Sequence, residues 1–214
     1  MKILAFNGSP RKEWNTATLL NKALEGAASQ GATTELINLY ELNYKGCMSC
    51  FACKLKGGSS YGHCVINDDL KPIFAKIEQA DAVIFGSPIY FGDITGQMRS
   101  FLERLLFQYY AYKNEDAVLF PKRLSVGMIY TMNVDHKLAS EWNYTAQWQR
   151  MESFLSAVLG ETEVLYAHDT YQFSDYNKYV CERFDETHKA QVRATEFPKQ
   201  CQQAFDLGVR LVSK

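Results

Sequence analysis

Short apolar runs alternate with helical patterns five times along the chain, and this alternation constrains the fold more than any other feature. The runs predict strands at residues 2–6, 34–39, 82–85, 124–130 and 163–167. Several of them are apolar on both faces, which is typical of parallel strands that helices cover from both sides. The sequence therefore predicts an α/β fold with a parallel sheet.

Helical spacing of apolar residues fills the segments between these runs. We expect helices at residues 16–29, 70–77, 97–110, within 138–159, and over much of the tail from about residue 179. Asp68 and Asp69 open the second helix, where acidic side chains suit the helix dipole. Pro198 is expected to start the last helix near Lys199.

Two doubly wound layouts fit this alternation, a Rossmann dinucleotide-binding sheet and a five-stranded flavodoxin-like sheet. Five strands in 214 residues favour the second, a three-layer α/β sandwich with strand order 2-1-3-4-5. No linker or repeat divides the chain, so we expect a single domain over residues 1–214. Ligands bind at the carboxyl ends of such strands, so the loops after Phe6, Phe85 and Tyr130 should carry the site.

Composition excludes several classes of protein. A formal net charge of -1 gives no electrostatic reason to expect a nucleic-acid partner. The apolar runs are strand-sized, far short of the about 20 residues that span a membrane, so no membrane partner is expected. The apolar start is interrupted at Asn7 and Gly8 and no cleavage site follows, so we interpret it as a strand of a cytoplasmic protein.

The loop after the first strand has the groups that a phosphate requires. Ser9 and Thr16 supply hydroxyls, Arg11 a positive fork and Asn15 an amide, and the next helix presents free backbone N–H groups. The loop lacks both the GxGxxG fingerprint and the P-loop pattern. The alternative is an ordinary turn in which Asn15 caps the helix and Arg11 is solvated.

Two motifs together resemble a known family. Gly8-Ser9-Pro10-Arg11 with Asn15-Thr16, and the segment 86–98 that begins Gly-Ser-Pro-Ile-Tyr-Phe-Gly, resemble the NADPH-dependent FMN reductase-like branch of the flavodoxin-like superfamily. The segment 169–173 is similar to the one after strand five in some members. The resemblance implies an oxidoreductase that takes hydride from NADH or NADPH through FMN. It passes electrons to a flavin, quinone, nitro, azo or similar acceptor, which is a small molecule or a protein.

The same resemblance implies which residues bind FMN. The set around the phosphate is Ser9, Arg11, Asn15, Thr16 and Ala17. The set around the flavin ring is Pro88, Ile89, Tyr90, Phe91 and Gly92. The set that forms the remaining wall is Thr131, Met132 and Asn133. Tyr90 and Phe91 either wall the ring or are plain rim hydrophobes. No catalytic acid or base is predicted, because the flavin carries the hydride chemistry. His136 is interpreted as an exposed loop histidine.

The cysteines leave two interpretations open. Cys47, Cys50 and Cys53, followed by Cys64, have the look of a four-thiolate [4Fe–4S] site. Iron–sulfur flavoproteins, relatives of the FMN reductases, carry a compact cysteine motif at this place, but ten residues separate Cys53 from Cys64 here. We expect thiols that pack the loop; the alternative is an electron-transfer flavoprotein with a cluster. Cys181 and Cys201 are interpreted as small core residues.

Near the end of the third predicted helix there are more aromatic residues than one buried helix face requires. Phe107, Tyr109, Tyr110 and Tyr112 lie there, and Trp142 and Trp148 add to them. They predict an interface of a homodimer or homotetramer close to the flavin, and the alternative is a large core.

Overall fold

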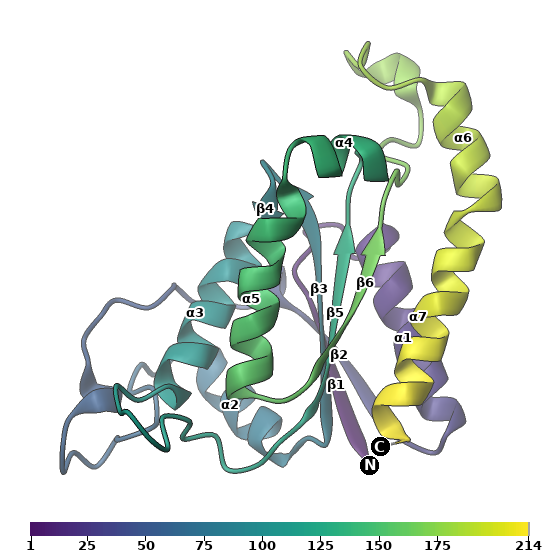
Figure 1. Ribbon diagram of the computed structural model, residues 1–214. Helices are drawn as coiled ribbons and strands as arrows, with labels where there is room; N and C mark the ends of the chain where they lie inside the picture. The colour runs from purple at the N-terminus through teal and green to yellow at the C-terminus, as the bar shows by residue number, and fades with distance from the viewer. Residues whose placement is uncertain (214) are drawn as a thin grey trace.

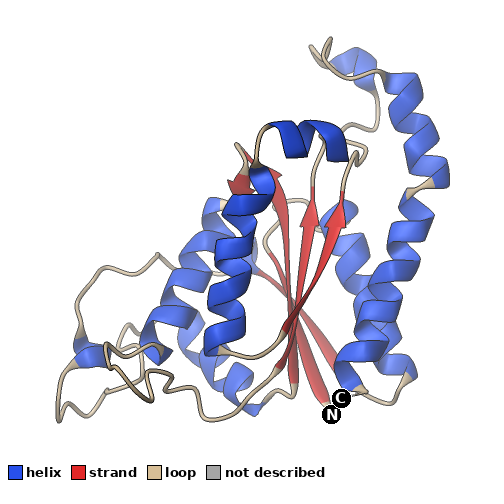
Figure 2. Cartoon of the chain, in the orientation of Figure 1, coloured by secondary structure: helices blue, strands red, loops and turns tan. Residues whose placement is uncertain are grey.

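The computed structural model describes residues 1–213 and shows a parallel sheet between two layers of helices (Figures 1 and 2). The parallel strands run in the order β2-β1-β3-β5-β6. Their bounds are β1 Lys2–Asn7, β2 Thr33–Asn38, β3 Ala82–Tyr90, β5 Ser125–Thr131 and β6 Thr162–Ala167. The predicted α/β sandwich and its single continuous sheet are confirmed.

A sixth strand, β4, is the feature of the sheet that the sequence pattern did not reveal. β4 is Asp93–Ile94, and it pairs antiparallel with the end of β3. It shifts the numbering, so the predicted order 2-1-3-4-5 holds for the parallel strands alone. The chain can reverse direction between β3 and β4 because Phe91 and Gly92 both take positive φ values, 52° and 85°, directly after β3.

The helices cover both faces of the sheet (Figure 2). In chain order they are α1 Asn15–Ser29, α2 Leu70–Gln79, α3 Gly96–Tyr109, α4 His136–Glu141, α5 Tyr144–Val158, α6 Glu186–Thr195 and α7 Phe197–Val212. Three short 3-10 turns are η1 Leu39–Glu41, η2 Ala52–Lys54 and η3 Tyr176–Lys178. As predicted, Pro198 lies in the first turn of the last helix.

Two predicted helical segments differ from the structure. The helix expected within residues 138–159 is two helices, because Asn143 has a φ of +54° and cannot continue α4. The tail is irregular from Tyr179 until Asp185 caps α6 by accepting a hydrogen bond from the backbone N–H of His188 at 2.8 Å. In Figure 1, α4 lies across the carboxyl ends of the strands, and the irregular segment before α6 extends beyond them.

Alternating strand residues build a core on each side of the sheet. Leu4 and Phe6 of β1 pack on the α2, α3 and α5 side, whereas Ile3 and Ala5 pack on the α1 and α7 side. A Cβ added at Gly208 would lie 1.8 Å from the Ala23 carbonyl oxygen, so α1 and α7 are in backbone contact there. No helix within residues 1–213 is both long enough and apolar enough to cross a membrane.

The aromatic surplus near α3 is divided between core and surface. Tyr109 and Trp148 are each only 1% exposed, whereas Tyr110 is 40% and Tyr112 73% exposed. Tyr109 packs edge-on against Phe120, so the chain covers part of this surplus itself. The predicted interface therefore has fewer aromatic residues available than the sequence indicated.

Candidate functional site

A pocket opens at the carboxyl edge of the sheet, between the last residues of β3 and the connections that follow β1, β5 and β6. It is lined by Ser9, Arg11, Trp14, Asn15, Thr16, Pro88, Ile89, Tyr90, Thr131, Met132, Asn133, Thr170, Tyr171 and Gln172. Ten of the thirteen residues predicted to bind a cofactor are among them. The topology explains this convergence, because parallel strands bring their carboxyl ends to one edge.

Side chains fold the loop after β1 into a tight turn. The Asn7 side chain accepts a hydrogen bond from the Ser9 backbone N–H at 3.0 Å, and the Ser9 hydroxyl accepts one from the Arg11 N–H at 3.1 Å. Gly8 is fixed on both sides, because its N–H donates to the Gly86 carbonyl at 2.8 Å and its carbonyl accepts from the Thr95 hydroxyl at 2.8 Å. These four hydrogen bonds define the conformation of the loop.

The helix after this loop presents its free amino end to the pocket. α1 begins at Asn15, and no side-chain hydrogen bond from Trp14 caps it. Asn15 is therefore not the helix cap; its amide donates to the Tyr171 carbonyl at 2.7 Å instead. The first-turn N–H groups have no partner within the helix, which is the arrangement that binds anions.

The carboxyl end of β3 and the connection after β5 form the facing walls. Tyr90 is 47% exposed at the pocket, and partial burial raises the pKa of its phenol. Phe91 is fully exposed and does not line the pocket, and neither does Gly92. Ala17 is fully buried in the first turn of α1, so only its backbone can serve a phosphate. The roles of these three residues stay predictions.

The turn at Gly92 is rigid. Gly92 accepts a hydrogen bond at its carbonyl from the Trp148 indole at 2.8 Å, and its φ is +85°. A Cβ at this position would lie 2.8 Å from the Tyr144 ring. α5 therefore fixes the loop that follows β3.

Asn133 contributes an unpaired acceptor. Its amide nitrogen donates to the Gln172 side-chain oxygen at 2.6 Å, and its Oδ1 is buried without a partner among the described residues. A buried acceptor without a partner is costly, so a ligand with a donor should bind here. FMN offers such donors in its ring N–H and its ribityl hydroxyls, so the residues present fit it.

Four pocket residues were not on the predicted list. Trp14 donates from its indole to the Tyr171 carbonyl at 3.1 Å, and Thr170, Tyr171 and Gln172 form the wall after β6. The similarity of residues 169–173 to the family was a usable signal for three of them. His136 stands in the first turn of α4, its ring 5.3 Å from that of His168, and does not line the pocket.

The four cysteines line a second, smaller pocket together with Arg104, Phe107 and Gln108 of the carboxyl half of α3. Cys53 is buried, Cys50 is exposed, and Cys47 and Cys64 are intermediate. Burial raises the pKa of the Cys53 thiol, although the neighbouring Lys54 opposes this. Within residues 1–213, no three His, Cys, Asp or Glu side chains are arranged to hold a metal ion. The thiols share a pocket, but their arrangement does not fit a metal centre as it stands.

Comparison with known sequences adds a family match. A family model described as NADPH-dependent FMN reductase matches residues 1–139. An iron–sulfur flavoprotein of Methanocaldococcus jannaschii is 38% identical over 104 residues, which cover 49% of this chain and 51% of that protein. One of Archaeoglobus fulgidus is 39% identical over 104 residues, which cover 49% and 48%. The chain therefore spans about half the length of the curated relatives it matches.

Solved structures share the fold at low sequence identity. An NAD(P)H:quinone oxidoreductase from Methanothermobacter marburgensis superposes with a TM-score of 0.72 at 14% identity, over 99% of this chain and 98% of that one. An azoreductase from Bacillus anthracis gives 0.62 at 14% identity, over 98% and 99%. At this identity the likeness concerns the fold alone.

Proposed function

The chain belongs to the NADPH-dependent FMN reductase family, and from this premise we propose that it is an FMN-dependent oxidoreductase. It takes hydride from NADH or NADPH and passes electrons to an acceptor. The observation that carries this proposal is the single pocket in which the loop after β1, the carboxyl end of β3 and the wall after β5 meet. When bound, FMN supplies the hydride chemistry, and the chain supplies binding and orientation.

The phosphate end is assigned to the loop after β1 and the start of α1. The Ser9 and Thr16 side chains line the pocket there, with the free N–H groups of the helix beside them. Thr16 is held by Thr131, because their hydroxyls lie 2.7 Å apart in the interior. Arg11 lines the pocket and donates to the Gln172 carbonyl at 2.5 Å across it, which supports a role for its charge in binding the phosphate.

The ring end is assigned to the carboxyl end of β3 and the wall after β5. Pro88, Ile89 and Tyr90 form one wall, and Met132 and Asn133 belong to the other. The unpaired Asn133 Oδ1 orients a donor of the ring or the ribityl chain. Tyr90 is half-exposed, which leaves an approach for the nicotinamide.

The proposal also covers the electron acceptor and the oligomeric assembly of the protein. The structural neighbours are named for quinone and azo substrates, and a flat aromatic acceptor suits a flavin open at one face. A homodimer or homotetramer is the expected assembly, with cytoplasmic localisation. An apolar groove between α3 and α5, which includes Leu106, Tyr110 and Phe154, offers a surface for a second copy.

The test is anaerobic reduction of the FMN-loaded protein. We expect NADH or NADPH to bleach the bound flavin rapidly and a quinone to restore its absorbance. A flavin that responds slowly to both nicotinamides but rapidly to reduced ferredoxin would contradict the reductase and support an electron carrier.

A second candidate is an electron-transfer flavoprotein with a [4Fe–4S] cluster. It is supported by the four cysteines that share one pocket and by the names of the curated relatives. Iron and acid-labile sulfide in the anaerobically purified protein test it, with Cys50→Ser as the control that should remove both. We expect flavin with little iron.

A further inference from the structure

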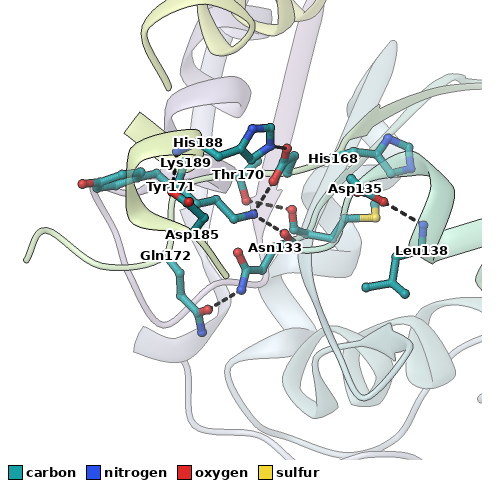
Figure 3. A network of polar contacts seen from close by, with 12 residues as sticks. Asn133, Asp135, Leu138, His168, Thr170, Tyr171, Gln172, Asp185, His188 and Lys189 are labelled. Atoms are coloured by element: carbon teal, nitrogen blue, oxygen red, sulfur yellow. Dashed lines mark hydrogen bonds and ion pairs between the residues drawn. The ribbon is translucent and has the colours of Figure 1, made fainter. Parts of the chain in front are cut away.

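A buried lysine of the C-terminal region supports the pocket lining from outside the part of the chain that the family model matches. Lys189 lies on α6, whereas the match ends at residue 139. Lys189 is 1% exposed, and its ammonium donates to the Asn133 carbonyl and to the Asp169 carboxylate (Figure 3). Burial of an ammonium group costs free energy unless the group is paired and hydrogen-bonded. These two partners therefore hold the Lys189 ammonium in its position.

Asp169 is the second member of this arrangement. Its φ is +58°, and its carboxylate also lies 2.6 Å from the His188 Nε2. Burial alone raises the pKa of Asp169, but the hydrogen bonds from Lys189 and His188 outweigh it, and the pKa is lowered overall. The carboxylate is thus held ionised beside the ammonium.

The backbone around Asp169 joins the walls after β5 and β6. The Asp169 N–H donates to the Val134 carbonyl at 2.9 Å, and the Thr170 N–H donates to the Met132 carbonyl at 2.9 Å. Lys189 therefore contacts both connections at the point where they are hydrogen-bonded to each other. Movement of either partner would displace the wall that carries Thr170 and Tyr171.

The effect on the pocket passes through Asn133. With its carbonyl fixed by Lys189, the Asn133 amide can donate to Gln172 while its unpaired Oδ1 stays buried in the lining. One helical turn further along α6, Arg193 donates to the Asn15 Oδ1 at 2.9 Å. α6 thus contacts the phosphate side and the ring side of the same pocket.

We propose that Lys189 is a positioning residue of the FMN pocket, which acts by fixing Asn133 and Asp169. This inference rests on the proposed function, since it assumes that the pocket binds FMN. Lys189 contacts no part of the cofactor in this account. Its contribution is the orientation of the buried amide that receives the cofactor.

The variants separate positioning from mere stability. Lys189→Met keeps a similar length but removes the ammonium, and we expect FMN affinity to fall at least about tenfold. Lys189→Arg retains a donor and should restore part of the affinity. The double variant Asp169→Asn with Lys189→Met removes both charges, and asparagine tolerates the positive φ at position 169. We expect this double variant to regain folding stability relative to Lys189→Met but not to regain FMN affinity. Lys199→Met, on an exposed lysine of α7, is the matched control.

The experiment is titration of the apoprotein with FMN, followed by quenching of flavin fluorescence, with circular dichroism to verify the fold of each variant. The expected result is weakened binding in Lys189→Met and in the double variant, with partial rescue by Lys189→Arg. A folded Lys189→Met or double variant with wild-type affinity would overturn the inference while leaving the proposed function intact. A folded wild-type chain that binds no FMN would overturn the proposed function, and the inference with it.

Discussion

The pocket at the strand ends and the cysteine pocket beside α3 were both predicted from short motifs, yet they differ in how their side chains are arranged. In the first, residues from the end of β3 and from three connections converge on one pocket, and side-chain hydrogen bonds order the loop after β1. In the second, four cysteines share a pocket without forming a metal-binding group within the described chain.

The difference has a physical origin. Parallel strands place their carboxyl ends at one edge, so topology alone brings the residues of the first pocket together. The cysteines lie on a long irregular segment between η1 and α2, where Ser49 and Phe51 take positive φ values of 54° and 55°. Of the four, Cys53 alone lies in a regular element, the short turn η2, so no shared helix or strand imposes a common geometry on their thiols.

The largest effect should come from the turn after β3. Gly92 and Gly57 both have positive φ, 85° and 74°, but only at Gly92 does an added Cβ meet another group, the Tyr144 ring at 2.8 Å. We expect Gly92→Ala to lower the free energy of unfolding by about 2–4 kcal/mol and Gly57→Ala, in the cysteine segment, by about 1 kcal/mol. Urea denaturation measures both, and equal losses would contradict the assigned rigidity.

Removal of the Arg11 guanidinium should weaken FMN binding at least about tenfold while leaving the fold intact, since hydrogen bonds to charged groups contribute about 1.5–3 kcal/mol. Lys12→Ala is the matched control, because Lys12 is the next residue, is paired with Glu41, and does not line the pocket. Fluorescence titration with FMN checks both variants. Unchanged affinity in Arg11→Ala would refute the phosphate assignment.

Acid should affect the wall after β6 through Asp169. Because the pKa of this carboxyl is lowered in the folded state, its contribution to stability is present above the unfolded pKa of about 3.9 and is lost as pH falls below it. Asp169→Asn should therefore be less stable than wild type at neutral pH, by about 1–2 kcal/mol, with a difference that shrinks as the pH falls towards 3. Thermal melts across this range measure it, and a difference independent of pH would contradict the assignment.

The smallest effect is expected at the cysteine pocket. Cys50 is exposed and lies outside the lining of the pocket at the strand ends, so Cys50→Ser should change FMN affinity by less than about twofold. The same fluorescence titration with FMN measures the affinity of this variant. A large loss of flavin in this variant would mean that the two pockets are coupled.

Sequence alone predicted the strands, their order and ten residues of the pocket because apolar periodicity and loop motifs are local signals. It did not predict β4, or the break at Asn143, because both depend on single residues with positive φ. Lys189 was also missed, since a lysine in a helix is ordinarily exposed, and its burial is decided by Asp169 and Asn133 from the connections after β6 and β5.

The most direct test of the account is the absorbance spectrum of the anaerobically purified protein, taken together with its iron and acid-labile sulfide content. The account predicts flavin bands alone, with FMN released on denaturation and little iron. A broad visible shoulder with near-stoichiometric iron and sulfide would contradict the distinction drawn between the two pockets, and a chain that neither retains nor rebinds FMN would contradict the assignment of the pocket at the strand ends.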